Sequence, residues 1–143
     1  MKSAILAFED GAVFRGKPFG AKKTVVGEAV FNTSMMGYQE LLTDPSNFMN
    51  ILVMTFTEIG CYGINPEDAE SGGIKAAGLV VAQECEKPSN WRSSMGLGEY
   101  LEINSIPGIP FIGGIVPAPI EPLLNISNDF CRQSEQIDIL FGR

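Results

Sequence analysis

The chain has 143 residues, the length of one globular domain, and a hydrophobic fraction of 45% that can fill a sizeable core. Ten Lys and Arg residues against 17 Asp and Glu residues give a net charge of −7, which argues against a nucleic acid partner. The sequence contains no histidine, so this chain alone cannot build a Ser-His or Cys-His nucleophilic pair.

Cellular location is predicted from apolar runs and cysteine spacing. No apolar run reaches the roughly 18 residues that a membrane span needs, and the apolar start at residues 3–8 is too short for a secretory signal. Cys61, Cys85 and Cys131 lie far apart and form no C-x-x-C pair. We interpret them as buried or incidental thiols in a reducing compartment and expect a cytoplasmic protein without a metal site.

Segments rich in apolar and β-branched residues fill the first part of the chain. Asp-Gly within Glu9-Asp10-Gly11 suits a hairpin turn. A loop is expected over residues 17–21, because Pro and Gly interrupt regular pairing, and a bulge at Gly27-Glu28. The three strands are predicted at residues 3–8, 13–15 and 24–32.

A short helix is predicted over residues 37–42, between two strands. Ser34 is the expected N-cap, and Pro45 ends the helix because proline disfavours α geometry in the residue before it. Residues 51–56 form a continuous apolar run, which is typical of a strand covered on both faces.

A long loop over residues 57–73 contains many turn residues and four acidic ones. The acidic residues do not have the spacing of a calcium loop, so a solvated loop is favoured over a cation site. A strand at 74–82, an amphipathic helix at 95–103 and an edge strand or irregular extended segment at 106–115 follow. The acidic residues of the loop are Glu58, Glu67, Asp68 and Glu70.

Residues 31–46 read F-N-T-S-M-M-G-Y-Q-E-L-L-T-D-P-S and include many polar residues that a core would not require. The segment resembles the signature of the amino-terminal domain of the small, glutamine amidotransferase subunit of carbamoyl phosphate synthetase. Residues 2–11, 77–81 (A-G-L-V-V) and 89–92 (S-N-W-R) also resemble motifs of this family. The resemblance covers about residues 2–109.

The resemblance implies an α/β fold, a three-layer swivelling β/β/α domain with mixed sheets and few short helices, over residues 1–115. After residue 110 the family's D-T-R motif is missing, and residues 116–143 are a divergent tail without a structural expectation. No segment resembles the family's second domain, which carries its Cys-His-Glu glutaminase machinery. The chain alone is therefore expected to be inactive.

Family members hydrolyse L-glutamine and pass ammonia to a large subunit, which binds ATP and Mg and makes carbamoyl phosphate for the arginine and pyrimidine pathways. The resemblance implies that this domain is non-catalytic, carries no cofactor, docks on the large subunit in a heterodimer and closes one side of the glutamine site. The alternative is a truncated or orphan interaction module without a role in a synthetase. We also expect an uncovered apolar patch if the domain lacks its partners.

Ser46 is the residue that the resemblance assigns to glutamine, because a hydroxyl can donate to or accept from a free amino acid. On residue type alone, closure of the turn after Pro45 is favoured. Tyr38 and Trp91 are aromatic interface candidates, with core packing as the alternative. The candidates for a cleft or interface, with capping and backbone satisfaction as the alternative, are Asn32, Thr33, Ser34, Tyr38, Gln39 and Glu40.

Overall fold

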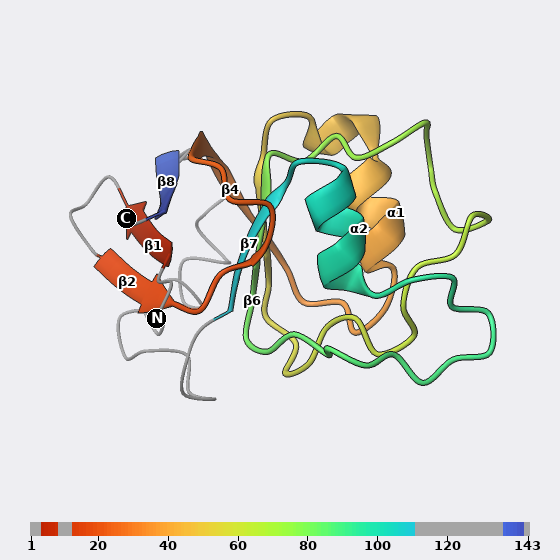
Figure 1. The fold of residues 1–143 in the computed structure, drawn as a ribbon. Coiled ribbons are helices and arrows are strands. Elements are labelled where there is room, and N and C mark those ends of the chain that lie inside the picture. Colours follow the sequence, from red (N-terminus) through yellow and green to blue (C-terminus); the bar gives the residue numbers. More distant parts are fainter. Residues whose placement is uncertain (1–3, 9–12, 111–135, 142–143) are drawn as a thin grey trace.

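The computed structural model describes residues 4–8, 13–110 and 136–141 (Figure 1). Strands predominate, with two short α-helices and a 3₁₀ helix. In chain order the elements are β1 (Ala4–Phe8), β2 (Val13–Gly16), β3 (Phe19–Gly20), β4 (Val25–Asn32), α1 (Tyr38–Thr43), η1 (Pro45–Asn47), β5 (Ile51–Met54), β6 (Gly78–Val81), α2 (Leu97–Ile103), β7 (Pro107–Pro110) and β8 (Gln136–Phe141).

The strands pair in the order β2-β1-β8-β4-β5-β6-β7-β3. Strands β4 to β7 run parallel to one another, and the remaining pairs are antiparallel. Strand β4 joins the antiparallel part of the sheet to the parallel part, because its first residues pair with β8 and its last residues pair with β5. Strand β8, from the tail, thus lies between β1 and β4.

Three layers result from this pairing (Figure 1). Strands β1, β2 and β8 form one layer, the parallel strands form the middle layer, and α1 and α2 cover the far face of the middle layer. The predicted three-layer β/β/α fold with mixed sheets and few short helices is therefore confirmed. Among the described residues, no helix has the length and apolar content needed to cross a membrane.

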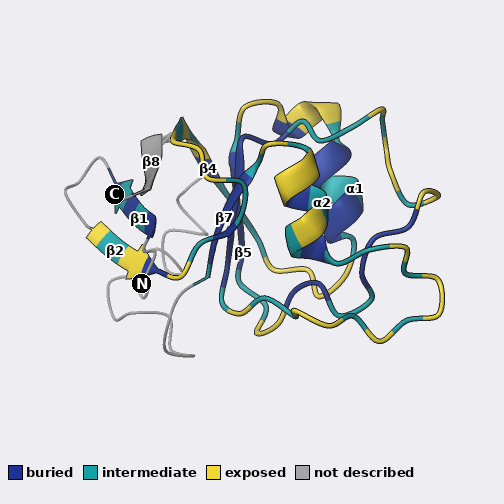
Figure 2. Cartoon of the chain, in the orientation of Figure 1, coloured by how far each residue is buried: buried dark blue, intermediate teal, exposed yellow. Residues whose placement is uncertain are grey.

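The inner strands of the middle layer, β5 and β6, are buried on both faces (Figure 2). In β5, Leu52 and Met54 pack in one cluster with residues of both helices, while Ile51 and Val53 pack in a second cluster with β1. Successive side chains of a strand point to opposite faces, so an unbroken apolar run is what this position requires. The predicted central strand is confirmed, although it ends at Met54.

The predictions for the hairpin and for the strand at residues 24–32 hold in their main features. The turn itself lies outside the described residues, but Ala7 pairs with Val13 in antiparallel register, as a hairpin requires. The predicted bulge is not seen in the pairing with β8, where each residue from Val25 to Glu28 has one partner. Gly27 is needed for another reason: a Cβ atom there would collide with the carbonyl oxygen of Met49.

Two predictions about sheet edges are wrong. The expected loop at residues 17–21 contains β3, in which Phe19 pairs with Gly108 of β7. Strand β7 is consequently not an edge strand, because β6 and β3 flank it on its two sides. Residues 111–115 of the predicted extended segment lie outside the described residues.

The loop at residues 57–73 forms neither a helix nor a strand, as predicted, but it is not simply solvated. Ile59, Ile64 and Asn65 are buried, and isolated bridges tie Ile59 to Glu84 and Ile64 to Met95. The loop is thus packed against the chain segments that follow β6, and its exposed residues include the acidic Glu58, Glu67 and Glu70.

Candidate functional site

The polar signature begins in a turn after β4. The side-chain Oδ1 of Asn32 accepts a hydrogen bond from the Ser34 backbone N at 2.8 Å, and the Asn32 carbonyl accepts one from Thr55 N at 3.0 Å. The predicted capping role of Ser34 is wrong, because the N-cap of α1 is Gly37, with φ of 82° and no side-chain cap. Thr33 and Ser34 are left exposed.

Tyr38 and Gln39, at the start of α1, point inward. The Tyr38 hydroxyl donates to the Gly63 carbonyl at 2.6 Å, and its ring stacks on Tyr62 with centroids 4.3 Å apart. Gln39 is only 2% exposed, and its amide bonds to both backbone groups of Asn65. Burial raises the pKa of Tyr38 and of Tyr62, so both phenols stay neutral.

Thr43 extends the contact between α1 and the loop after β5 to the last residue of the helix. Its hydroxyl accepts a hydrogen bond from Glu70 N at 2.8 Å and donates to the Gln39 carbonyl at 2.9 Å. The Ser71 hydroxyl donates to the Thr43 carbonyl at 2.6 Å. One face of α1 therefore holds the loop over residues 63–71 in place.

In the part of the chain that the structure describes, Glu40 is the signature residue with an unsatisfied buried polar atom. One of its carboxylate oxygens is buried and has no hydrogen-bond partner among the described residues. The cleft or interface role of Glu40, like that of Asn32, Thr33, Ser34, Tyr38 and Gln39, stays a prediction. Of these six, Thr33 and Ser34 have the most exposed side chains.

Ser46 is exposed in η1, directly after α1. Its backbone N donates to Asp44 Oδ1 at 2.8 Å, and this bond lowers the pKa of the Asp44 carboxyl. Asn47 is buried and donates from Nδ2 to the Leu41 carbonyl at 2.9 Å. The turn is thus closed by Asp44, Asn47 and backbone groups, and the Ser46 hydroxyl lies close enough to Asp44 to help lower the pKa of its carboxyl.

The structure does not bring Ser46 together with Thr33 and Ser34. Thr33 and Ser34 follow the carboxyl end of β4, whereas Ser46 precedes β5. Because β4 and β5 are parallel, these positions lie at opposite ends of the strands, with α1 between them.

A hollow of about 520 Å³ lies beside the loop that α1 holds. Its lining combines an exposed indole with an ion pair: Trp91 is 92% exposed, and Arg92 Nη2 lies 2.6 Å from Glu67 Oε2. Core packing of Trp91 is therefore excluded, while Tyr38 is packed in the core. The residues that line the hollow are Asn65, Pro66, Glu67, Trp91 and Arg92.

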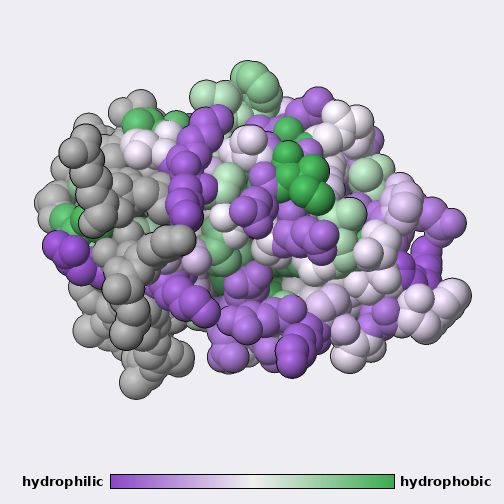
Figure 3. Space-filling model, in the orientation of Figure 1, coloured by the Kyte–Doolittle hydropathy of each residue, from purple (hydrophilic) through white to green (hydrophobic). Residues whose placement is uncertain are grey.

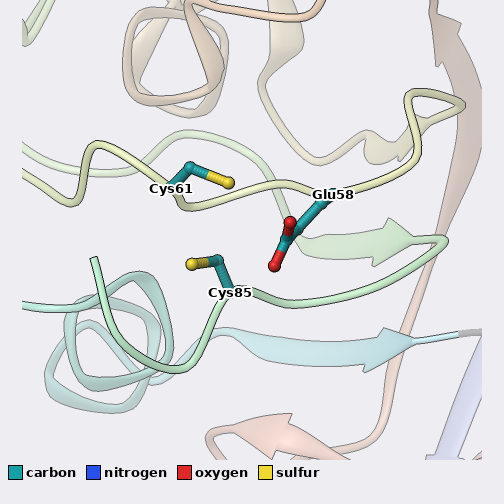
Figure 4. A group of neighbouring side chains, drawn as sticks. All are labelled: Glu58, Cys61 and Cys85. Carbon is teal, nitrogen blue, oxygen red and sulfur yellow. The ribbon is translucent and has the colours of Figure 1, made fainter. Parts of the chain in front are cut away.

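A second cluster joins Glu58, Cys61 and Cys85 (Figure 4). A carboxylate oxygen and the two sulfur atoms lie within 4.8 Å of one another. Sequence spacing did not indicate this cluster. The available signal was topological, because β5 and β6 are parallel neighbours and the segments that follow them leave the same edge of the sheet.

The family model "Carbamoyl-phosphate synthase small chain, CPSase domain" matches residues 6–114. Most of the described fold lies within this match, and the chain therefore belongs to this family. It is 58% identical to the carbamoyl phosphate synthase small chain of Syntrophotalea carbinolica over 106 residues, which are 74% of this chain and 28% of the relative.

Other small chains show similar coverage. Identity is 54% to the small chain of Thermotoga maritima over 108 residues, 76% of this chain and 28% of the relative. Identity is also 54% to the small chain of Archaeoglobus fulgidus over 109 residues, 76% of this chain and 30% of the relative. The chain thus spans less than a third of the length of these curated relatives.

Proposed function

We propose that this chain is the domain by which a glutamine-dependent carbamoyl phosphate synthase small chain docks on its large chain and forms one wall of the glutamine site. The observation that carries the proposal is the match to the CPSase domain over residues 6–114, within a folded three-layer domain. The sequence has no histidine, so the reactive pair for glutamine hydrolysis has to come from another domain.

The wall would contact L-glutamine through Ser46. Ser46 is exposed beside the Asp44 carboxyl, and a hydroxyl can both donate to and accept from the amino or carboxylate group of an amino acid. ATP and Mg would be bound by the large chain of a cytoplasmic heterodimer, and the carbamoyl phosphate would serve arginine and pyrimidine synthesis. This chain alone would hydrolyse no glutamine.

The proposed docking surface is the hollow with Trp91 and Arg92. Exposed Trp and Arg side chains are enriched in protein interfaces, where a hollow gives a partner side chain a place to pack. The view in Figure 3 is mainly hydrophilic, with a small hydrophobic patch near α2. Among the residues whose burial the structure describes, the other exposed large hydrophobic residues are Val13, Val26, Met35, Met36, Phe48, Met49 and Ile103.

A competition assay tests the proposal. The folded chain is added in excess to a two-chain carbamoyl phosphate synthase, and synthesis is measured with glutamine and with ammonia as the nitrogen source. We expect glutamine-dependent synthesis to fall as the chain displaces the intact small chain, while ammonia-dependent synthesis is unchanged. Loss of both activities, or of neither, would contradict the proposal; chain unfolded by heat is the control.

An interaction module without a synthetase is the second candidate. Strand β8 favours this second function. The strand belongs to the same chain and occupies the position between β1 and β4, so no second chain is needed to pair with β1 and β4 there. The same assay separates the two functions, since such a module leaves glutamine-dependent synthesis unchanged at every concentration.

A further inference from the structure

Glu58, Cys61 and Cys85 converge from two segments of the chain (Figure 4). Glu58 and Cys61 belong to the loop after β5, and Cys85 follows β6. Their ligand-type atoms lie within 4.8 Å of one another, although the two cysteines are 24 positions apart in the sequence. We name these three residues the Cys-Cys-Glu cluster.

Backbone hydrogen bonds fix the two segments of the Cys-Cys-Glu cluster relative to each other. Ile59, which lies between Glu58 and Cys61, is fully buried and bonds through both its N and its carbonyl oxygen. Ile59 N donates to Gln83 O at 3.0 Å, and Cys85 N donates to Ile59 O at 2.9 Å. The carbonyl of Cys61 also accepts a bond from Ser89 N at 3.0 Å.

Gly60 allows the turn that brings Cys61 back toward Glu58. Its φ of 105° lies in a region that other residues rarely adopt, and a Cβ atom there would lie 3.2 Å from Leu97 Cβ. The backbone that carries the cluster is thus defined by packing as well as by hydrogen bonds. Such a site is organised before any ion binds.

The donor set selects the class of ion. Two sulfur atoms favour a borderline-soft transition metal such as Zn²⁺ over Ca²⁺ or Mg²⁺, which take oxygen ligands. With Zn–S of about 2.3 Å and Zn–O of about 2.0–2.2 Å, tetrahedral donors lie roughly 3.4–3.8 Å apart. The separations of up to 4.8 Å in the cluster need only small side-chain movements to reach these values.

The neighbouring acidic groups also affect the protonation of Cys61. Partial burial, followed by the proximity of Cys85 and Glu58, raises the pKa of the Cys61 thiol to about 11. A divalent cation at the cluster would favour the thiolate form of Cys61, because a coordinating thiol is deprotonated.

We propose that the Cys-Cys-Glu cluster binds one divalent ion of the zinc class, with its fourth coordination position open to water or to a partner side chain. Both thiols release their protons on binding, so two thiolates and one carboxylate around a dication leave a net charge of −1. The bound ion would join the segments after β5 and β6. It would bind whether or not the chain docks on a large chain.

Cobalt titration of the reduced, metal-free full chain tests the proposal. Co²⁺ at one equivalent should give a thiolate-to-metal charge-transfer band and the visible bands of tetrahedral cobalt, and Zn²⁺ should abolish both. Cys61→Ser and Cys85→Ser should each weaken Zn²⁺ binding by at least about 100-fold, since even outer-shell partners are worth about 10–100-fold. Glu58→Gln, at an exposed position, should weaken binding about 10-fold or more without unfolding the chain.

Matched controls locate the ion. Glu70→Gln changes an exposed acidic residue of the same loop, and Cys131→Ser removes the remaining thiol; both should leave Zn²⁺ affinity unchanged. The absence of a tetrahedral cobalt spectrum would overturn the proposal. So would equal Zn²⁺ affinity in the wild type and Glu58→Gln.

Discussion

The side-chain amide of Gln39 and the backbone of Asn65 form a reciprocal pair of hydrogen bonds. Gln39 Nε2 donates to the Asn65 carbonyl at 2.6 Å, and Gln39 Oε1 accepts from Asn65 N at 3.0 Å. Both residues are buried, so water cannot replace either bond. A helix residue thus satisfies the backbone of a loop that has no regular pairing of its own.

Gln39→Met should destabilise the domain by about 2–4 kcal/mol, because it leaves a buried N–H and a buried carbonyl without partners. Urea unfolding followed by circular dichroism measures the loss. Gln83→Met, at an exposed position, is the matched control and should change stability by less than about 0.5 kcal/mol. Equal stability of the two variants would show that the Gln39 bonds contribute nothing net.

Tyr38→Phe should lower the free energy of unfolding by about 1–2 kcal/mol. The substitution keeps the ring that stacks on Tyr62 but removes the donor to the buried Gly63 carbonyl. Thermal unfolding compares it with Tyr100→Phe, which removes a hydroxyl without a hydrogen bond to a described residue. A Tyr38→Phe variant as stable as wild type would mean that another group satisfies Gly63.

Gly108→Ala should destabilise the folded domain by about 1–3 kcal/mol, because the added methyl group overpacks the core. A Cβ atom at Gly108 would lie 2.6–2.8 Å from the ring of Phe19, which covers β7 from the neighbouring β3. Gly72→Ala is the control, because nothing lies within 4 Å of the added atom. If both substitutions have the same effect on the unfolding midpoint, the ring is not held against β7.

Asp44→Ala should destabilise the domain near neutral pH and progressively less in acid. The Ser46 N–H lowers the pKa of the Asp44 carboxyl, so the native state binds this proton less readily than the unfolded chain. The stabilisation is therefore fully present above the unfolded pKa of about 3.9 and is lost as the pH falls through the lower native value.

Unfolding of Asp44→Ala and wild type as a function of pH measures this effect. Ser46→Ala is the control, because it keeps the N–H that is the main cause of the lowered Asp44 pKa and should retain most of the wild-type pH dependence. A difference between Asp44→Ala and wild type that stays constant down to low pH would contradict the assigned cause.

The pattern of apolar residues was sufficient to predict the central strands and both α-helices from the sequence. Residues 51–54 could be recognised as covered on both faces because their burial requires an unbroken apolar run. The two-residue strand β3 could not, since it pairs with β7, which is distant in the sequence, and Phe19 covers Gly108 there.

The direction of polar side chains was harder to predict than their presence. Gln39 and Tyr38 are polar yet buried, because the loop after β5 offers them backbone partners that lie 25 and 26 positions away in the sequence. The approach of Cys61 to Cys85 likewise depends on two loops at one edge of the sheet. No local sequence pattern encodes such placements.

Trp91→Ala should weaken docking on a large chain by about 30-fold, the loss expected for an exposed tryptophan that becomes the centre of an interface. Ile103→Ala removes another exposed hydrophobic residue, on α2, and should leave the affinity within about 3-fold. Equal losses in the two variants would place the interface elsewhere.

Sedimentation velocity of this chain mixed with a purified carbamoyl phosphate synthase large chain tests the docking role most directly. We predict that the chain moves into the faster boundary as a one-to-one complex. If the chain sediments alone at concentrations at which an intact small chain forms that complex, it is not a docking domain of the synthase.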